Sequence, residues 1–146
     1  MSEPFITPLR RISTPNGDVL HAMKASDAGF TGFGEAYFSC VHSGAIKGWK
    51  RHSRMTLNLV CIVGKIRFVV YRKLADRVPV LDATLSPDDP AHYGRLTVPP
   101  LFWVGFSGVS CEMSMLLNVA DLPHDSSEAE SIPLTSFRWP TEVSTK

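Results

Sequence analysis

Short apolar runs that end at glycine or proline recur along the sequence, and they constrain the fold more than any other feature. Eleven prolines and ten glycines separate runs rich in β-branched, aromatic and aliphatic residues. Several runs alternate apolar and polar side chains, as strands with one buried face do, and none has the 3.6-residue apolar spacing of an amphipathic helix. The predicted strands cover residues 36–41, 55–63, 65–71, 80–85, 94–98, 102–106 and 114–119.

Seven or more short strands at roughly 8–12-residue spacing predict an all-β protein, either an antiparallel sandwich or a barrel. Gly64 lies between two of the runs, where a glycine turn is expected to reverse the chain into a hairpin. A chain of 146 residues fits a single domain, which we assign to residues 1–146. The last twenty residues are rich in Ser, Glu, Thr and Pro, and they predict a flexible tail from about residue 126.

Composition narrows the expected partners and compartment. The net charge is +1 at pH 7, so the chain lacks the basic excess typical of proteins that bind nucleic acid or anionic membranes. Three widely spaced cysteines without a Cys-x-x-Cys pair indicate neither a zinc ribbon nor a disulfide framework. No stretch reaches the ~18 apolar residues of a membrane span, and no apolar leader is visible. We therefore expect a soluble cytoplasmic protein.

Glycine and proline spacing resembles that of cupins, which are jelly rolls. The first cupin motif matches Gly44-(x)5-Lys50-x-His52-(x)4-Leu57-(x)6-Gly64, and the second matches Gly94-(x)5-Pro100-x-Phe102-(x)2-Gly105. Three of the four metal-ligand positions of that motif hold Lys50, Leu57 and Gly105. One histidine is too few for a transition metal or zinc, which needs about three to four protein ligands. We expect a non-metal jelly roll; the alternative, a metal-dependent cupin dioxygenase, predicts stoichiometric iron in the purified protein.

The order of several further segments resembles the dTDP-4-dehydrorhamnose 3,5-epimerase family, the RmlC-like branch of the cupins. The chain is similar to a divergent, short member of that family, and the resemblance runs from about Phe5 to Pro140. No single segment is diagnostic, and the resemblance depends on their common order and spacing. The segments are residues 17–21, 44–52, 55–60, 64–69, 96–100, 118–125 and 139–140.

This resemblance implies a function in deoxysugar or surface polysaccharide biosynthesis. Family members bind a nucleotide-diphosphate 4-keto-6-deoxyhexose, of dTDP type, inside the jelly roll. They epimerise carbon 3, carbon 5 or both by α-proton transfer, without a cofactor, and they pair as homodimers. The alternative is a cupin that binds the nucleotide sugar but has lost epimerase activity. That alternative is favoured by the leucine at position 117, where the family has a tyrosine, and by the absence of the family's C-terminal aspartate.

The α-proton chemistry needs a base, a group that stabilises the enolate oxygen, and an acid on the opposite face. The family's base position falls on Lys50, and the nearest histidine is His52, our candidate base, because imidazoles in general titrate near neutral pH. Lys50 is a candidate for stabilising the enolate oxygen. Tyr37, which shares a strand face with Ser39, and His124 are the candidate acids. For His124, both Asp121 and Asp125 remain possible partners.

Candidate substrate-binding residues surround the cationic segment 44–52. Lys47 and Lys50 are three apart in an extended segment, so we expect them on opposite faces, with only one lining a given cavity. Trp49 shares a face with neither and is expected in the core or a dimer interface. Thr56 and Asn58 alternate with leucines and are expected at a pocket mouth. The candidate binding residues are Lys47, Arg54, Thr56, Asn58 and Asn118. For each, the alternative is a structural or solvated side chain.

Overall fold

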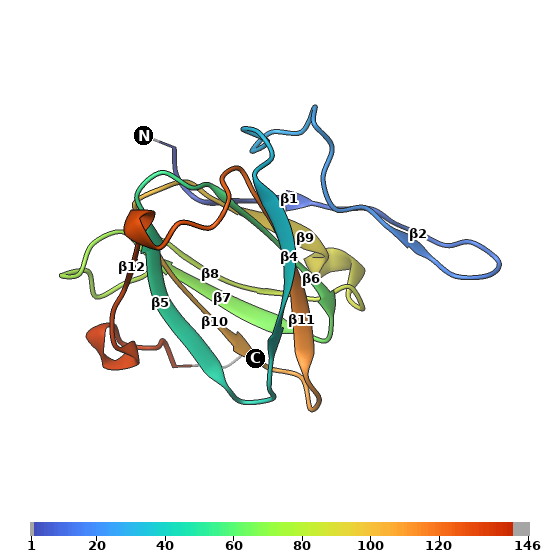
Figure 1. The fold of residues 1–146 in the computed structure, drawn as a ribbon. Helices are drawn as coiled ribbons and strands as arrows, with labels where there is room; N and C mark the ends of the chain where they lie inside the picture. Colours follow the sequence, from blue (N-terminus) through green and yellow to red (C-terminus); the bar gives the residue numbers. More distant parts are fainter. Residues whose placement is uncertain (1, 142–146) are drawn as a thin grey trace.

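The computed structural model describes residues 2–141, which fold into two packed five-stranded antiparallel sheets and a small two-stranded sheet (Figure 1). The first large sheet has the strand order β1-β9-β6-β11-β4, and the second has the order β12-β5-β10-β7-β8. From β4 onward the chain crosses from one large sheet to the other at every step except β7 to β8. This alternation is that of a jelly roll, and it confirms the predicted all-β class.

Each of the seven predicted runs corresponds to a strand whose bounds agree to within two residues, and the other strands lie outside those runs. The strands of the first sheet are β1 (Phe5–Pro8), β4 (Glu35–Val41), β6 (Leu57–Val63), β9 (Gly94–Val98) and β11 (Ser114–Ala120). Those of the second are β5 (Ile46–His52), β7 (Ile66–Tyr71), β8 (Leu81–Leu85), β10 (Trp103–Gly108) and β12 (Ala129–Ser131). The remaining elements are β2 (Arg11–Ile12), β3 (Val19–Leu20) and the short helices η1 (Pro90–His92), η2 (Ser126–Glu128) and η3 (Leu134–Ser136). None of the helices in residues 2–141 is long and apolar enough to cross a membrane.

Gly64 joins two strands that do not pair, so the predicted hairpin is wrong. β6 lies in one sheet and β7 in the other, and the turn at Gly64 carries the chain between the sheets. Gly64 has φ +80°, and a Cβ atom there would lie 2.3 Å from the Ser114 hydroxyl oxygen. Glycine is therefore needed at this turn for both its backbone angle and its lack of a side chain. Alternation alone revealed the two strands but not which strand each would join.

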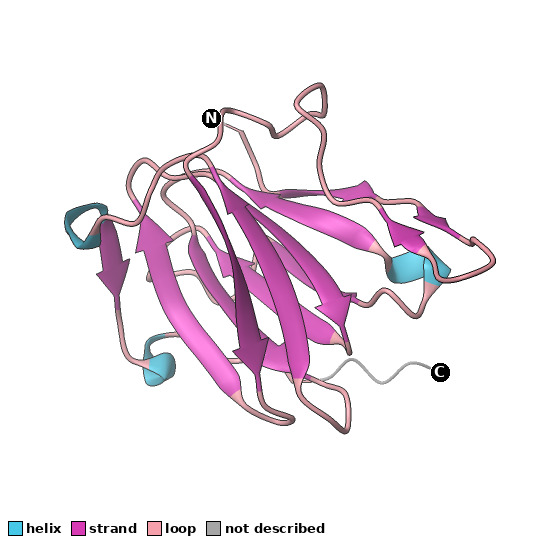
Figure 2. Cartoon of the chain, turned by 45° about the vertical axis from the view of Figure 1, so that its right-hand side comes forward, coloured by secondary structure: helices cyan, strands magenta, loops and turns pink. Residues whose placement is uncertain are grey.

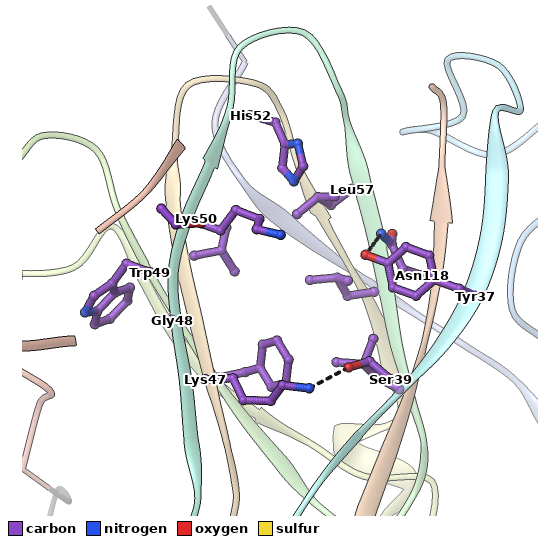
Figure 3. A pocket seen from close by; sticks show the side chains of 14 residues that line it. Tyr37, Ser39, Lys47, Gly48, Trp49, Lys50, His52, Leu57 and Asn118 are labelled. Carbon is purple, nitrogen blue, oxygen red and sulfur yellow. Dashed lines mark hydrogen bonds between the residues drawn. The ribbon is translucent and has the colours of Figure 1, made fainter. Parts of the chain in front are cut away.

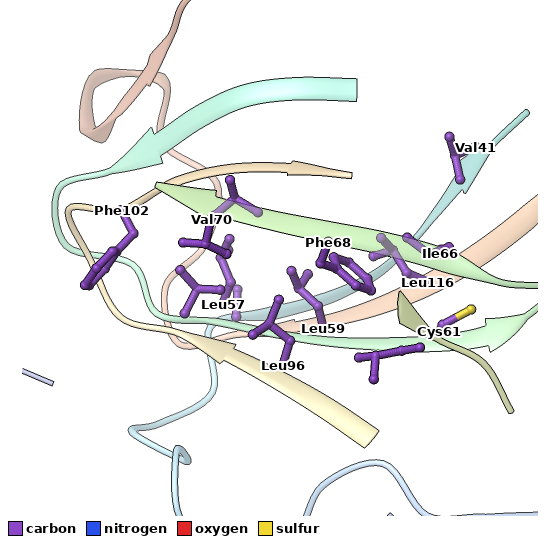
Figure 4. Close-up of a cluster of buried hydrophobic side chains, with 14 of the residues drawn as sticks. Val41, Leu57, Leu59, Cys61, Ile66, Phe68, Val70, Leu96, Phe102 and Leu116 are labelled. Atoms are coloured by element: carbon purple, nitrogen blue, oxygen red, sulfur yellow. The ribbon is translucent and has the colours of Figure 1, made fainter. Parts of the chain in front are cut away.

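The two large sheets lie face to face (Figure 2), and the main hydrophobic core fills the space between them (Figure 4). On β6 the side chains of Leu57, Leu59 and Cys61 point inward, and on β7 those of Ile66, Phe68 and Val70 meet them. Burial raises the pKa of the Cys61 thiol to about 12, so this cysteine is protonated at physiological pH. The alternating pattern in the sequence thus predicted correctly which face of each strand is apolar.

Residues 126–139 cover the outer face of the second sheet, where the sequence predicted a flexible tail. β12 pairs with β5, and Phe137 packs beside Trp49 with ring centroids 5.2 Å apart. The Trp49 indole also donates a hydrogen bond to the Leu134 carbonyl at 3.0 Å. Trp49 is therefore a core residue, as expected. The flexible-tail prediction is wrong for residues 126–141, because the aromatic face of the sheet requires a cover; residues 142–146 lie outside the described residues.

An irregular segment of residues 22–31 covers the outer face of the first sheet. Arg95 is fully buried on β9, and its guanidinium donates to the carbonyls of Ala22 and Ala28 and to the Asp27 carboxylate. Next to it, the Asn58 side-chain amide donates to the Gly29 carbonyl at 3.1 Å. Polar side chains on the outer sheet face thus hold this irregular segment in place, because they donate hydrogen bonds to backbone carbonyls that would otherwise lack partners.

Candidate active site

A cavity of ≈ 270 Å³ opens between the two large sheets on the side where β4 and β5 form the rim (Figure 3). One part of its wall is apolar and comprises Leu57, Leu59, Val104, Phe106 and Leu116. The polar side chains that line it are Tyr37, Ser39, Lys47, Lys50, His52, Asn118 and Ser131. A concave apolar site with a few convergent polar groups is the usual form of a small-molecule pocket.

Both lysines of the cationic segment point into the cavity, although the sequence predicted opposite faces (Figure 3). Lys50 pairs with Val104 and Lys47 pairs with Phe106, so β5 has one more residue than β10 between these two pairs. Such a bulge shifts the alternation of side chains by one position. Trp49 points away from the cavity into the aromatic cluster, so Lys47 and Lys50 share a face that excludes it.

The Lys47 and Lys50 ammonium groups have different surroundings. Lys47 donates to the Ser39 hydroxyl and to the Cys40 carbonyl, both at 3.0 Å. Lys50 makes no side-chain hydrogen bond or ion pair with any of residues 2–141. Lys47 is therefore held against β4, whereas Lys50 offers a cation to a ligand in the cavity.

His52 is backed by the carboxylate of Glu128, a residue that the sequence analysis missed. The His52 Nδ1 atom is hydrogen-bonded to Glu128 Oε1, and both residues are buried. The other oxygen of Glu128 accepts the backbone N–H groups of Arg54 at 3.0 Å and of Met55 at 3.2 Å. The carboxylate is thus fixed by three donors, and the imidazole that it holds lines the cavity.

These hydrogen bonds keep the Glu128 carboxylate ionised and orient the His52 imidazole. Burial alone would raise the pKa of Glu128, but the bonds from His52, Arg54 and Met55 hold it below the ordinary value. The ionised carboxylate accepts a proton-bearing Nδ1, so Nε2 is the imidazole nitrogen that remains for the cavity. A histidine oriented in this way by a carboxylate is suited to act as a general base.

Tyr37 and Asn118 form the opposite wall of the cavity. The two residues are cross-strand partners on β4 and β11, and the Asn118 amide donates to the Tyr37 hydroxyl at 3.0 Å. Ser39 lies on the same face of β4 as Tyr37, as the spacing predicted. Leu117, at the family's tyrosine position, lies between Leu116 and Asn118, which both line the cavity. Tyr37 on the neighbouring strand therefore supplies a phenol to this wall (Figure 3).

Two predicted site residues, His124 and Arg54, lie outside the cavity. His124 is exposed in the loop after β11, so its assignment as an acid is wrong. Its two expected partners are used elsewhere: Asp125 caps η2, and Asp121 accepts the Thr56 backbone N–H at 2.8 Å. The Arg54 guanidinium points to Asp125 at 3.6 Å. Arg54 therefore contributes to the site only through its backbone N–H group, which donates to Glu128.

The sequence also predicted Thr56 and Asn58 at the pocket mouth, but neither residue lines the cavity. Asn58 is buried on the outer face of β6, where its side chain contacts Gly29 and accepts the Thr97 hydroxyl at 2.7 Å. The leucines on either side of it face the cavity instead. Both faces of β6 are covered, so a polar residue on this strand did not mark the ligand side. Across residues 2–141, no group of three or more His, Cys, Asp or Glu side chains is arranged to hold a metal ion.

No model of a known protein family matches the chain, and no curated protein matches it. A solved structure does. The dTDP sugar isomerase from Desulfovibrio desulfuricans G20 is 35% identical, and the match covers 89% of this chain and 83% of that one with a TM-score of 0.80. The chain belongs to the RmlC-like family of dTDP-sugar isomerases.

More distant solved structures share the fold. The epimerase RmlC from Legionella pneumophila, in complex with dTDP-4-keto-L-rhamnose, is 17% identical, with coverage of 92% and 74% and a TM-score of 0.74. The sugar 3,4-ketoisomerase QdtA from Thermoanaerobacterium thermosaccharolyticum, in complex with TDP, is 17% identical, with coverage of 88% and 87% and a TM-score of 0.68. The predicted RmlC-like jelly roll is thereby confirmed.

Glu128 escaped the sequence analysis because no local pattern marks it. It lies 76 residues from His52 in the sequence, and it reaches His52 only because β12 pairs with β5 at the edge of the second sheet. One signal was available, since Asp125 followed three residues later by Glu128 resembles a helix N-terminal capping pattern. That pattern is more typical of an ordered segment than of a flexible tail.

Proposed function

We propose that the chain is a cofactor-independent nucleotide-sugar epimerase. Its substrate would be a dTDP-linked 4-keto-6-deoxyhexose, and it would invert carbon 3, carbon 5 or both by α-proton transfer. The observation that carries this proposal is the buried His52–Glu128 pair at the wall of the cavity. Family membership supports the substrate class, since the related structures are named for dTDP sugars and two of them hold such ligands or TDP.

In this reaction His52 removes the proton. The ketone at carbon 4 makes the hydrogens on the neighbouring carbons acidic, and Nε2 is the imidazole nitrogen available to accept one. Glu128 stabilises the imidazolium that forms. The negative charge moves to the ketone oxygen, where the free Lys50 ammonium on the same strand stabilises the enolate.

Tyr37 returns a proton from the other side of the sugar. His52 lies on β5 and Tyr37 on β4, in different sheets and on opposite sides of the cavity (Figure 3). A base and an acid on opposite faces of the ring give inversion of the carbon between them. All the groups that the chemistry requires are thus protein side chains.

The cavity accommodates the sugar rather than the whole nucleotide sugar. Its ≈ 270 Å³ lies just below the roughly 300–1,000 Å³ of pockets that enclose drug-sized ligands. We therefore place the hexose inside and the nucleotide diphosphate at the open side, beside the cationic residues of β5. We further propose that the protein is a homodimer, as the family resemblance implies, and that it is cytoplasmic.

Deuterium exchange tests the proposed function. When the wild-type protein is incubated with dTDP-4-keto-6-deoxyglucose in deuterated water, we expect NMR to show deuterium at carbon 3 or carbon 5. The same spectra should show an inverted stereocentre. Measurable binding without exchange would contradict the epimerase and favour the binding-only alternative. The Glu128 carboxylate that holds His52, together with Tyr37 at the cavity, supports the enzyme over that alternative.

A further inference from the structure

Asn118 is fully buried, and its amide group has a fixed orientation. Its side-chain oxygen accepts the backbone N–H of Asn58 at 3.2 Å, and its side-chain nitrogen donates to the Tyr37 hydroxyl at 3.0 Å. Rotating the amide by 180° would place its NH₂ group against the Asn58 N–H, so that two donors would face each other. The backbone of β6 therefore dictates that Tyr37 meets a donor and not an acceptor.

This contact leaves the Tyr37 hydroxyl with one role. Its oxygen accepts the Asn118 N–H, and no acceptor among residues 2–141 takes its hydrogen. Because Tyr37 lines the cavity, the hydrogen is free to be donated to a group bound there. A donor that remains on the phenol oxygen also stabilises the negative charge that proton transfer would leave on it.

We propose that Asn118 is a positioning residue that keeps the Tyr37 hydroxyl as a proton donor toward the cavity. This inference rests on the proposed function and assigns to Asn118 a task other than contact with the substrate. It acts on the second half of the reaction, the return of a proton, and not on proton removal by His52. The two halves are therefore expected to respond differently to substitution of Asn118.

The test measures two rates on one substrate in deuterated water, namely α-deuterium exchange and stereochemical inversion. For Asn118→Ala we expect inversion to fall about tenfold to 100-fold, whereas exchange stays close to the wild-type rate. Tyr37→Phe should give the same pattern, and the double variant should be no slower in inversion than Tyr37→Phe alone. In Asn118→Asp the carboxylate still accepts the Asn58 N–H, and in its ionised form it would also accept the Tyr37 hydrogen. The inversion rate of this variant should therefore also be lower than that of the wild type.

Each outcome either supports or overturns the inference. Equal loss of exchange and inversion in both Asn118 variants would show a merely structural role. A further loss of inversion when Asn118→Ala is added to Tyr37→Phe would overturn it as well, since Asn118 would then act independently of the phenol. Absence of exchange in the wild type would overturn the proposed function itself, and this outcome is distinct from both.

Discussion

The His52→Asn variant is expected to exchange α-deuterium about 10²–10⁴-fold more slowly than the wild type. The substitution removes the Nε2 atom that would accept the substrate proton. The asparagine NH₂ takes a position similar to that of Nδ1, so it still donates to the buried carboxylate of Glu128, which would otherwise be left unpaired at a cost in stability. Binding of the nucleotide sugar, measured by calorimetry, should therefore change little.

His124→Asn is the matched control for this variant, because that histidine is exposed outside the cavity. It should exchange deuterium at the wild-type rate. Exchange that survives in His52→Asn would show that His52 is not the base, and exchange that disappears in His124→Asn would contradict the exclusion of His124 from the site.

The Glu128→Gln variant is expected to lose a comparable factor of about 10²–10⁴ in exchange, through the tautomer of His52. The Arg54 and Met55 N–H groups require an acceptor, so the glutamine oxygen must stay with them and its NH₂ must face Nδ1. Nδ1 then accepts a hydrogen bond, the proton moves to Nε2, and the imidazole can no longer act as a base toward the cavity. The rate is measured by the same exchange assay.

Glu130→Gln provides the control, since Glu130 lies two residues after Glu128, on β12, and pairs with Arg51 at the surface. Its exchange rate should equal that of the wild type. Full activity in Glu128→Gln would mean that the carboxylate only fixes the loop after β5. A nitrogen NMR spectrum that locates the imidazole proton would separate these two roles.

Alternation and turn residues were sufficient to predict the all-β class, and the jelly roll followed from the resemblance to cupins. Strands β4, β6, β7, β9 and β11 coincide with predicted runs to within two residues, because each contributes apolar side chains to the core between the sheets. The pairing of strands could not be predicted in the same way. Gly64 marks a turn, but whether that turn makes a hairpin or a crossing depends on contacts distant in sequence.

The candidate site was only partly predictable from the sequence. His52, Tyr37, Lys47 and Lys50 line the cavity, and three of them lie in the cationic segment that stood out by its composition. The shared face of the two lysines could not be predicted, since it depends on a bulge in the pairing of β5 with β10. Asn58 was misassigned because the strand of β6 is covered on both faces, and Glu128 was missed because it reaches His52 only through tertiary structure.

A crystal structure of the His52→Asn variant with dTDP-4-keto-6-deoxyglucose would show where the substrate binds. We expect the hexose to occupy the cavity between the sheets, with the face of carbon 3 or 5 toward the substituted side chain. We also expect the ketone oxygen to lie near the Lys50 ammonium and the Tyr37 hydroxyl to lie on the far face of the ring. A nucleotide sugar bound elsewhere, with the cavity filled only by solvent, would contradict the proposed site.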